Sequence, residues 1–338
     1  MSLIRTRPRP LLIQNGPRKH VDFEPPPSVA GNLSPDLQPN SPPIFPTNDC
    51  QNVLQIGKYI LQRQLEANNL YKAINVDNRE EYVCKVISVD KYRETLAAYW
   101  RCDSHQHINE IKEILLGETN AYVFFETSHG DLHSYVRDRR RLKEEEASRL
   151  FAQIVLAVDE CHENGIILRD LKLRKFVFKD KERTQLKLEG LEDSCVLDDD
   201  TDDSLMEKHG CPAYVSPEIL NTNECYSGKA ADIWSLGVML YTMLVGRYPF
   251  HDTEPGALFT KIRRGHYTIP DTISSRAKCL IRSLLRRDPQ ERLSGNEILR
   301  HPWFSSRFPC RGPLRTDSKD CDQTVPDVFG IDDSSFFL

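Results

Sequence analysis

Five short motifs follow one another along the chain, and their order constrains the fold more tightly than any one of them does. A strand-like run contains Lys85, a charged loop carries Asp170, and a later run closes at Glu218. Asp232 then begins the run Asp-Ile-Trp-Ser-Leu-Gly, and Arg292 comes last. One such motif can arise by chance, but a chance origin for all five in this order is remote. The order therefore predicts one large domain in which each motif has a fixed place.

Hydrophobic patterning predicts strands in the first part of this domain and helices in the second. Short β-branched and aromatic runs separated by Asn and Asp indicate strands, and apolar residues three and four apart indicate amphipathic helices. Strands followed by helices are typical of an α+β fold, here with two lobes joined after Glu126. The expected strands are 58–61, 70–73, 82–87, 122–125 and 186–188, and the expected helices are 144–161, 230–245 and 272–285.

The five motifs resemble those of protein kinases. The resemblance implies a two-lobed protein-kinase-like fold in which the loop at residues 168–175 corresponds to the catalytic loop H-R-D-L-K-x-x-N. It also implies that Glu218 and Arg292 form a buried bidentate ion pair, and that Asp232 braces the backbone of the loop. These structural residues are all present.

The loop itself departs from the kinase pattern at its ends. A kinase uses an Asp to accept the substrate proton, a Lys close to the transferred phosphoryl group, and an Asn to hold magnesium. Asp170 and Lys172 are kept here, but Leu168 replaces the usual His. Lys175, a cation, stands where the metal-binding Asn belongs.

The second metal position and the phosphate-binding loop are also altered. The metal-binding D-F-G is expected after residues 186–188, where the chain has Gly190-Leu191-Glu192. Gly190 offers no carboxylate to magnesium, a hard cation that needs oxygen ligands. Residues 65–70, in place of a Gly-rich loop, contain no glycine and carry Glu66, which would repel ATP phosphates. We therefore expect a pseudokinase with no metal site and no required cofactor.

Two interpretations of the remaining catalytic residues stay open. Lys85, Asp170 and Lys172 are either structural relics, with Lys85 paired to Glu192 or Asp170, or the parts of a weak atypical kinase that binds ATP without metal. The helix that would bring a Glu to Lys85 is expected to be short or distorted, with Glu94 as its nearest acid.

Composition indicates an intracellular, soluble protein. A net charge of −5, from 45 basic and 50 acidic residues, does not indicate a surface that binds nucleic acids or membranes. No apolar run has the length of a membrane span. Ten Cys without a C-x-x-C pair indicate reduced thiols. Cys84 and Cys211 lie in apolar stretches and are predicted to be small core residues.

Two polar segments flank the kinase-like domain, which we place at residues 56–304. The arm at 1–55 is rich in Pro and Ser and is expected to be disordered. Its dispersed basic residues fit either nuclear import or a solvated tail. The tail at 305–338 is polar and ends in an acidic stretch with an apolar tip.

Four further runs narrow the resemblance to the Tribbles family of pseudokinases: 168–176, 190–192, 208–214 and 226–232. The family usually has Ser where this chain has Gly190. The resemblance implies a scaffold in cytoplasm and nucleus that brings substrates to the constitutive-photomorphogenic E3 ubiquitin ligase. It implies a CCAAT/enhancer-binding transcription factor as a substrate, and MAP kinase kinases and Akt as further partners. Substrate binding is expected to reshape the 190–192 segment and to free the tail.

The tail carries a motif that matches the D-Q-x-V-P pattern through which the family binds the ligase. A Val-Pro dipeptide is held extended by the proline ring, and acidic residues precede it, as suits a peptide that docks in a partner's groove. The residues expected to bind the ligase are Asp322, Gln323, Val325, Pro326 and Asp327.

A second run matches the family pattern I-L-x-x-H-P-W-F, which implies docking of MAP kinase kinases. Ordinary kinases also end in H-P-W-F, so the alternative is a structural role in which Trp303 packs against the large lobe. A third function, a kinase-inhibiting decoy, requires the segment to be exposed. Its residues are Ile298, Leu299, His301, Pro302, Trp303 and Phe304.

Overall fold

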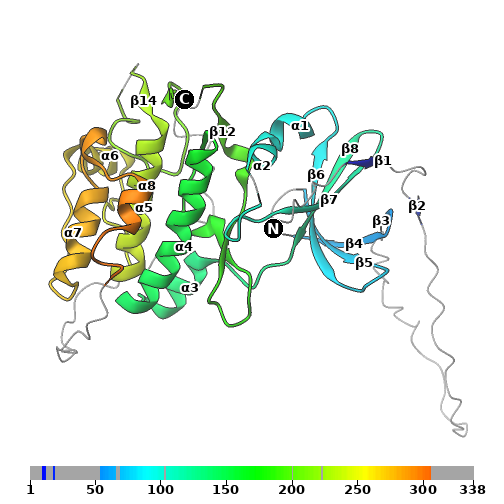
Figure 1. Cartoon of the computed structure of the whole chain (residues 1–338), viewed down its shortest axis with the longest axis horizontal. Coiled ribbons are helices and arrows are strands. Elements are labelled where there is room, and N and C mark those ends of the chain that lie inside the picture. The colour runs from blue at the N-terminus through cyan, green and yellow to red at the C-terminus, as the bar shows by residue number, and fades with distance from the viewer. Residues whose placement is uncertain are drawn as a thin grey trace, which may run out of the picture. The chain divides into compact units, whose positions relative to one another are not determined.

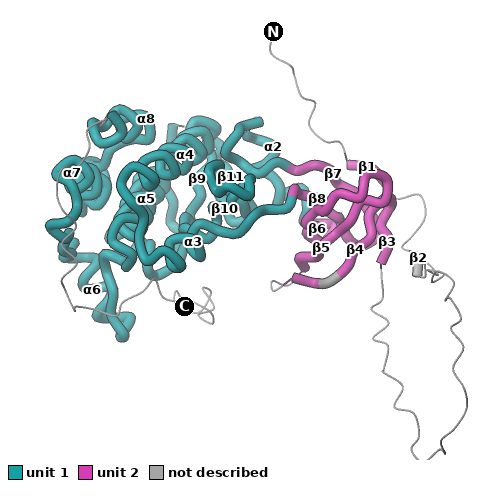
Figure 2. The backbone as a smooth tube through the Cα atoms, turned by 90° about the horizontal axis from the view of Figure 1, so that it is seen from below, with its two compact units in different colours: residues 1–7, 92–110, 127–338 teal, residues 8–91, 111–126 magenta. Residues whose placement is uncertain are grey.

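The computed structural model describes residues 10–12, 18–19, 54–65, 69–102, 104–199, 201–221 and 224–305. The chain divides into two compact units, shown in different colours in Figure 2. The smaller unit comprises residues 8–91 and 111–126, and the larger comprises 1–7, 92–110 and 127–338. Each unit has a hydrophobic core of its own.

The smaller unit is built on one mixed sheet with the strand order β1-β7-β8-β6-β5-β4-β3-β2 (Figure 1). Neighbouring strands are antiparallel, apart from the parallel pair of β1 with β7. The strands predicted in this unit are confirmed, with ends that differ by up to three residues, whereas β1, β2, β3 and β7 were not predicted. The expectation of disorder at 1–55 is wrong where β1, β2 and the start of β3 join the sheet. The bounds are β1 Leu11–Leu12, β2 Arg18–Lys19, β3 Leu54–Ile56, β4 Tyr59–Gln64, β5 Leu70–Asn75, β6 Glu81–Ser88, β7 Ile111–Leu116 and β8 Asn120–Glu126.

Aromatic side chains on one face of this sheet form the core of the smaller unit. The Tyr59 ring stacks on Phe124 with centroids 3.7 Å apart. The Tyr59 hydroxyl donates to Glu113 over 2.7 Å, which satisfies the polar end of a buried ring. Cys84 is fully buried beside them, as predicted, and its burial raises the pKa of the thiol.

The larger unit is mainly helical (Figure 1). The three predicted helices are confirmed as α4, α5 and α7, while α3 and α6 were not predicted. The helices are α1 Tyr92–Thr95, α2 Ala97–Arg101, α3 Leu132–Arg139, α4 Glu144–Glu163, α5 Gly228–Val245, α6 Pro255–Arg264, α7 Ser275–Leu284 and α8 Gly295–Leu299. Short antiparallel pairs join β9 Ile166–Ile167 to β12 Cys195–Val196, β10 Phe176–Phe178 to β11 Leu186–Leu188, and β13 Ser204–Leu205 to β14 Tyr226–Ser227.

Helix α5 forms the centre of the larger unit because nearly all its residues are buried. The Ser227 side chain accepts a hydrogen bond from the Ala230 N–H and caps its start. Gly246 ends it in the left-handed conformation, with φ 81°. The same helix carries Asp232 in its first turns, so the core helix also positions the loop at Asp170.

The helix expected to be short or distorted is indeed broken into α1 and α2. Leu96 separates the two pieces and is fully buried. Helical hydrogen bonds continue through this junction, from the Leu96 N–H to the Tyr92 carbonyl over 3.0 Å and from the Trp100 N–H to the Leu96 carbonyl over 3.2 Å.

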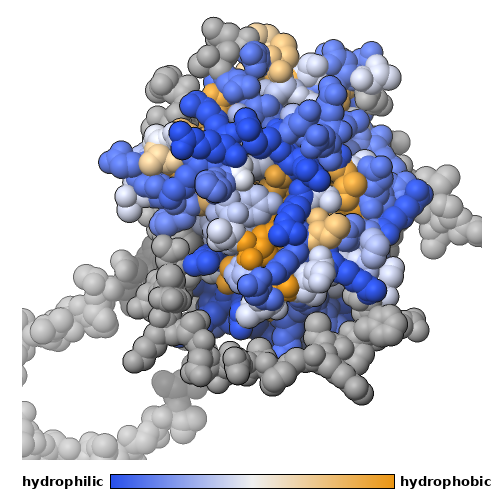
Figure 3. Space-filling model, turned by 90° about the vertical axis from the view of Figure 1, so that its left-hand side faces the viewer, coloured by the Kyte–Doolittle hydropathy of each residue, from blue (hydrophilic) through white to orange (hydrophobic). Residues whose placement is uncertain are grey.

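Helix α7 keeps its apolar side inward, with Ala277, Leu280, Ile281 and Leu284 buried. Figure 3 views the molecule from the α7 side and shows a mainly hydrophilic face interrupted by small hydrophobic areas. Among the described residues, the structure contains no helix with the length and apolar character to span a membrane.

Candidate functional site

The loop at Asp170 is held from below by the carboxylate of Asp232. Backbone N–H groups of Leu168 and Arg169 donate to its two oxygens over 2.8 and 3.0 Å. His162 Nε2 lies 2.9 Å from the same carboxylate. Asp232 is only 2% exposed, so these partners offset the cost of burying its charge. The predicted brace is confirmed.

The second predicted structural pair is also present. Arg292 donates two parallel hydrogen bonds to Glu218, with Nη1–Oε1 2.5 Å and Nη2–Oε2 2.7 Å. The guanidinium also donates to the carbonyl of Ala230 and lies 5.1 Å from the centre of the Trp234 ring. This bidentate pair fastens the segment ending at Glu218 to the start of α5.

Lys172 and Lys175 both face the carboxylate of Asp170. The Lys172 Nζ lies 2.8 Å from Asp170 Oδ2, and the Lys175 Nζ lies 3.8 Å from the same oxygen. A substrate-proton acceptor in a kinase works beside one lysine and two metal-binding groups. Here the carboxylate is instead shared by two cations of the same loop.

Lys175 joins the Asp170 loop to the segment that replaces D-F-G. Its Nζ donates to the Gly190 carbonyl over 2.9 Å and to Asp193 Oδ2 over 3.0 Å. The side chain is 13% exposed, so the ammonium is mostly surrounded by protein. The lysine thus stands at one of the two positions that carry metal ligands in a kinase and brings its positive charge against the other, Gly190.

These residues do not fit a magnesium site. Magnesium requires near-octahedral oxygen coordination, commonly with carboxylate ligands. The Gly190 carbonyl and an Asp193 oxygen already accept from Lys175, and a second cation there would be repelled by its charge. In the described ranges, no group of three or more His, Cys, Asp and Glu side chains is arranged around a common point for a metal ion.

Gly190 begins a tight turn that continues through the 3₁₀ helix Leu191–Asp193. Its φ of 75° lies in the left-handed region, which favours glycine over residues with a Cβ. The Leu191 N–H donates to the Tyr99 hydroxyl on α2 over 3.2 Å, and that hydroxyl lies 3.5 Å from Glu192. Burial raises the pKa of Tyr99 well above its usual value, so the phenol stays neutral. Sequence reasoning missed this Tyr99 contact.

Lys85 lies in the smaller unit, on β6, opposite Leu70 of β5 and Val123 of β8. The structure describes Leu65, Asn69 and Leu70 of the glycine-free stretch, while residues 66–68 are outside the described residues.

Of the two predicted docking segments, the structure describes only residues 298–304. Residues 322–327 lie outside the described residues, so their ligase-binding role stays a prediction. In the second segment, Ile298 on α8 is buried and Pro302 is exposed.

Trp303 in that second segment is 2% exposed, with its ring edge-on to Phe151. Its Nε1 donates to Glu144 over 3.2 Å. These contacts support the packing interpretation for Trp303.

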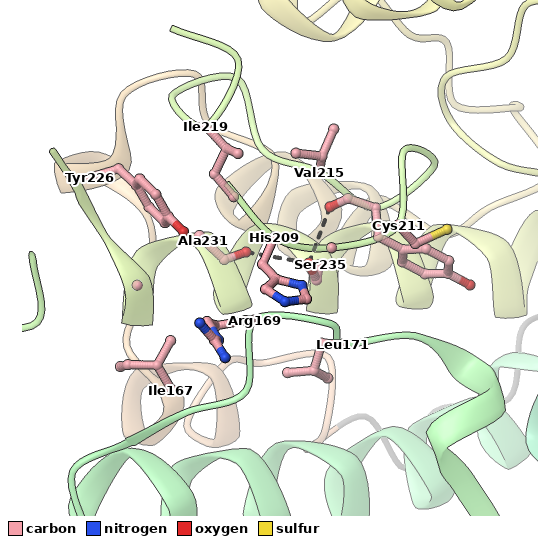
Figure 4. Close-up of a pocket in the computed structure, with 13 residues that line it drawn as sticks. Ile167, Arg169, Leu171, His209, Cys211, Val215, Ile219, Tyr226, Ala231 and Ser235 are labelled. Carbon is pink, nitrogen blue, oxygen red and sulfur yellow. Dashed lines mark hydrogen bonds between the residues drawn. The ribbon is translucent and has the colours of Figure 1, made fainter. Parts of the chain in front are cut away.

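A pocket that sequence reasoning missed lies beside the Asp170 loop (Figure 4). Arg169 and His209 supply its basic groups, and most of its other walls are apolar or aromatic. Arg169 donates from Nε and Nη2 to the Asp193 carbonyl over 2.9 and 2.7 Å, and its Nη1 lies 3.4 Å from Glu207. The lining residues are Ile167, Arg169, Leu171, His209, Gly210, Cys211, Tyr214, Val215, Ile219, Tyr226, Gly228, Ala231 and Ser235.

Two glycines permit the close packing around this pocket. A Cβ on Gly228 would come within 2.6 Å of Ile167. Gly210 has φ 120°, and a Cβ there would lie 2.9 Å from the Arg169 carbonyl oxygen. Cys211 is buried, as predicted. The Ser235 hydroxyl donates to the Tyr214 carbonyl and fixes the pocket wall on α5 (Figure 4).

Comparison with known proteins agrees with the kinase-like fold. Residues 66–304 match the protein kinase domain. Tribbles homolog 2 of Mus musculus is 60% identical over 297 residues, which cover 88% of this chain and 86% of the relative. Tribbles homolog 1 of Homo sapiens is 56% identical over 284 residues, covering 84% and 76%. Tribbles homolog 3 of Mus musculus is 50% identical over 313 residues, covering 91% and 86%.

Proposed function

The chain belongs to the Tribbles family and contains a protein kinase domain, and on this premise we propose that it is a non-catalytic adaptor. In this function one surface of the larger unit holds a substrate protein, and the C-terminal tail recruits an E3 ubiquitin ligase. The substrate is then modified by the ligase, without phosphoryl transfer by this chain.

The contact of Lys175 with Gly190 and Asp193 is the observation that carries the non-catalytic part of the proposal. Metal-assisted phosphoryl transfer depends on neutralising charge that develops on the phosphate oxygens. A lysine hydrogen-bonded to the Gly190 carbonyl makes the site stable without metal. Asp170 then has Lys172 as a close partner and acts as part of the loop structure.

The pocket beside Arg169 supports a substrate-holding role for the larger unit. The Arg169 guanidinium suits an acidic group of an extended peptide, whereas the apolar walls enclose only about 10 Å³ of free space and would have to move apart to admit a side chain. Glu207, the acidic partner of Arg169 beside the Asp193 carbonyl, has a side chain that is 83% exposed and can be displaced at little cost. We propose an acidic segment of a transcription factor of the CCAAT/enhancer-binding class as the occupant.

The tail residues Asp322, Gln323, Val325, Pro326 and Asp327 are proposed to bind the constitutive-photomorphogenic ligase. The support is the match of their order to the family pattern and the extended preference of a Val-Pro dipeptide. Docking of MAP kinase kinases and Akt, and residence in cytoplasm and nucleus, belong to the same proposal.

A pull-down of the ligase by the full chain tests the proposal. The double variant Val325→Ala/Pro326→Ala is expected to lose ligase binding while its melting temperature stays at that of the wild type. The matched control Pro313→Ala/Leu314→Ala changes a proline and an aliphatic residue in the same tail and is expected to keep binding. Undiminished ligase binding by the Val325/Pro326 variant would contradict the tail's role.

A separate variant tests the pocket. Arg169→Gln should weaken binding of an acidic substrate peptide and leave ligase binding intact, because the two sites are on different parts of the chain. Equal peptide affinity in Arg169→Gln and the wild type would remove the pocket from the proposal.

A further inference from the structure

Two buried thiols touch each other in the larger unit. The Sγ atoms of Cys102 and Cys161 are 4.0 Å apart, although 59 positions separate the residues in the chain. Both are free thiols. Cys161 lies on α4 and is fully buried, while Cys102 follows the end of α2 and is 8% exposed. The pair is therefore inside the fold but close to solvent on the Cys102 side.

The helix beside Cys102 also contacts the turn that replaces D-F-G. The Tyr99 hydroxyl on α2 accepts from the Leu191 N–H over 3.2 Å. Arg101 Nη1 donates to the Leu197 carbonyl over 3.0 Å. Any restraint on the end of α2 therefore acts on the segment at 191–197.

We propose that Cys102 and Cys161 form an oxidation site, at which a hydroperoxide converts the two thiols to a disulfide that fastens α2 to α4. The sulfurs must approach by about 2 Å to reach bonding distance, a movement within reach of side-chain rotation and a small shift of α2. The short α2 helix is the mobile partner because it is five residues long, against twenty for α4. This inference does not depend on the adaptor function.

The step balances with hydrogen peroxide as the oxidant. The Cys102 sulfur attacks one peroxide oxygen, the O–O bond breaks, and a sulfenic acid and one water form. The Cys161 sulfur then attacks the Cys102 sulfur, and the S–O bond breaks. The departing hydroxide takes the Cys161 proton and leaves as a second water. Two thiols lose two electrons, and one peroxide gains them.

The surroundings favour Cys102 as the first thiol to react. Either sulfur of the pair can donate to the other. The contact with Cys102 and burial raise the pKa of Cys161, so Cys161 stays protonated. Cys102 also has the greater exposure of the two. Cys161 is then placed to resolve the sulfenic acid.

Mass spectrometry of the peroxide-treated full chain tests the site. The chain is treated folded, alkylated under denaturing conditions and digested. The expected product is a Cys102–Cys161 linked peptide that disappears after reduction, together with a rise of about 5–10 °C in melting temperature. Recovery of both residues as alkylated thiols or as sulfinic acids, without the linked peptide, would overturn the proposal.

Two variants and one further measurement sharpen the test. Cys102→Ser should abolish both the linked peptide and the temperature shift, whereas the matched control Cys279→Ser, at an exposed cysteine, should keep both. Amide exchange at Leu191 should slow in the oxidised chain, because α2 is then fixed. A linked chain with unchanged exchange at Leu191 would overturn the coupling between the disulfide and the turn.

Discussion

Two parts of the larger unit differ in how their buried charged side chains are paired. Around α5, Asp232 and the pair Glu218–Arg292 meet the partners that a kinase fold requires. Beside the Asp170 loop, Lys175 takes a position that a metal ligand holds in a kinase and bonds to Gly190 and Asp193. The residues that stabilise the fold are thus different from those at the positions where a kinase binds magnesium. The first set, Asp232, Glu218 and Arg292, is complete in this chain, whereas the second set, at positions 175 and 190, is replaced. Variants can perturb each set separately.

The largest expected effect is on the complete set. Arg292→Ala leaves the Glu218 carboxylate buried without its bidentate partner, and we expect a loss of about 3–5 kcal/mol in the free energy of unfolding. Urea denaturation measures it. Arg286→Ala, at an exposed arginine 3.7 Å from Glu291, is the control and should cost less than about 0.5 kcal/mol. Similar losses in both variants would show that the Glu218–Arg292 pair does not brace the unit.

The second largest expected effect is a loss of stability on removal of the Trp303 ring. Its measurement distinguishes a packing role for this residue from a role in docking MAP kinase kinases. Trp303→Ala removes a buried ring and its hydrogen bond to Glu144, so we expect a loss of about 3–5 kcal/mol, at most equal to that of Arg292→Ala. The exposed neighbour provides the control, because Pro302→Ala should leave stability nearly unchanged. If Trp303→Ala kept full stability and lost only MAP kinase kinase binding, the residue would be a docking residue.

A smaller loss is expected from the replaced set. Lys175→Met keeps the volume of the side chain but removes the hydrogen bond to the Gly190 carbonyl, which should cost about 1–2 kcal/mol. The ion pair with Asp193 adds little because that carboxylate is 56% exposed. Lys278→Met, whose partner Asp271 is fully exposed, is the control and should lose less. A gain in stability for Lys175→Met would mean that the lysine strains the site.

The smallest expected effect is a dependence of the free energy of unfolding on pH. Burial lowers the pKa of His107, whose Nδ1 lies 3.0 Å from the Leu186 carbonyl, and burial also lowers the pKa of His301. The unfolded chain, with histidine near its usual pKa of about 6.5, then binds more protons than the folded chain below that pH. Stability should therefore be complete above about pH 6.5 and fall as the pH drops below it.

Unfolding titrations at about pH 7.5 and about pH 5.5 measure this slope. His107→Gln should reduce it, because one of the two depressed histidines is gone. An unchanged slope would assign the acid sensitivity to other groups.

The order of the motifs predicted the fold and the contacts of its structural residues. It did not predict the contacts that Lys175 and Gly190 make. Glu218, Asp232 and Arg292 were assigned correctly because each has a fixed partner in a kinase-like fold. The reach of Lys175 to Gly190 depends on the left-handed turn there, which the sequence signals only as a glycine. Tyr99 was missed because its contact with Leu191 joins residues 92 positions apart through the position of α2.

Secondary structure shows the same division. The long, strongly patterned α4 was predicted from residue 144 onward, and its end was placed two residues early. Helix α6 was missed because it is only ten residues long and begins at Pro255, although Leu258, Phe259 and Ile262 give it an apolar side that packs on the core. The pocket beside Arg169 was missed because it is assembled from the loop, residues 209–219 and α5, which no local pattern joins.

Transfer of labelled phosphate from ATP by the wild-type full chain, with and without magnesium, tests the central claim most directly. Because Lys175 bonds to the Gly190 carbonyl where a metal would be held, we predict no transfer that depends on magnesium. Magnesium-dependent transfer that is lost in Lys85→Met would contradict the account and identify the chain as a working kinase.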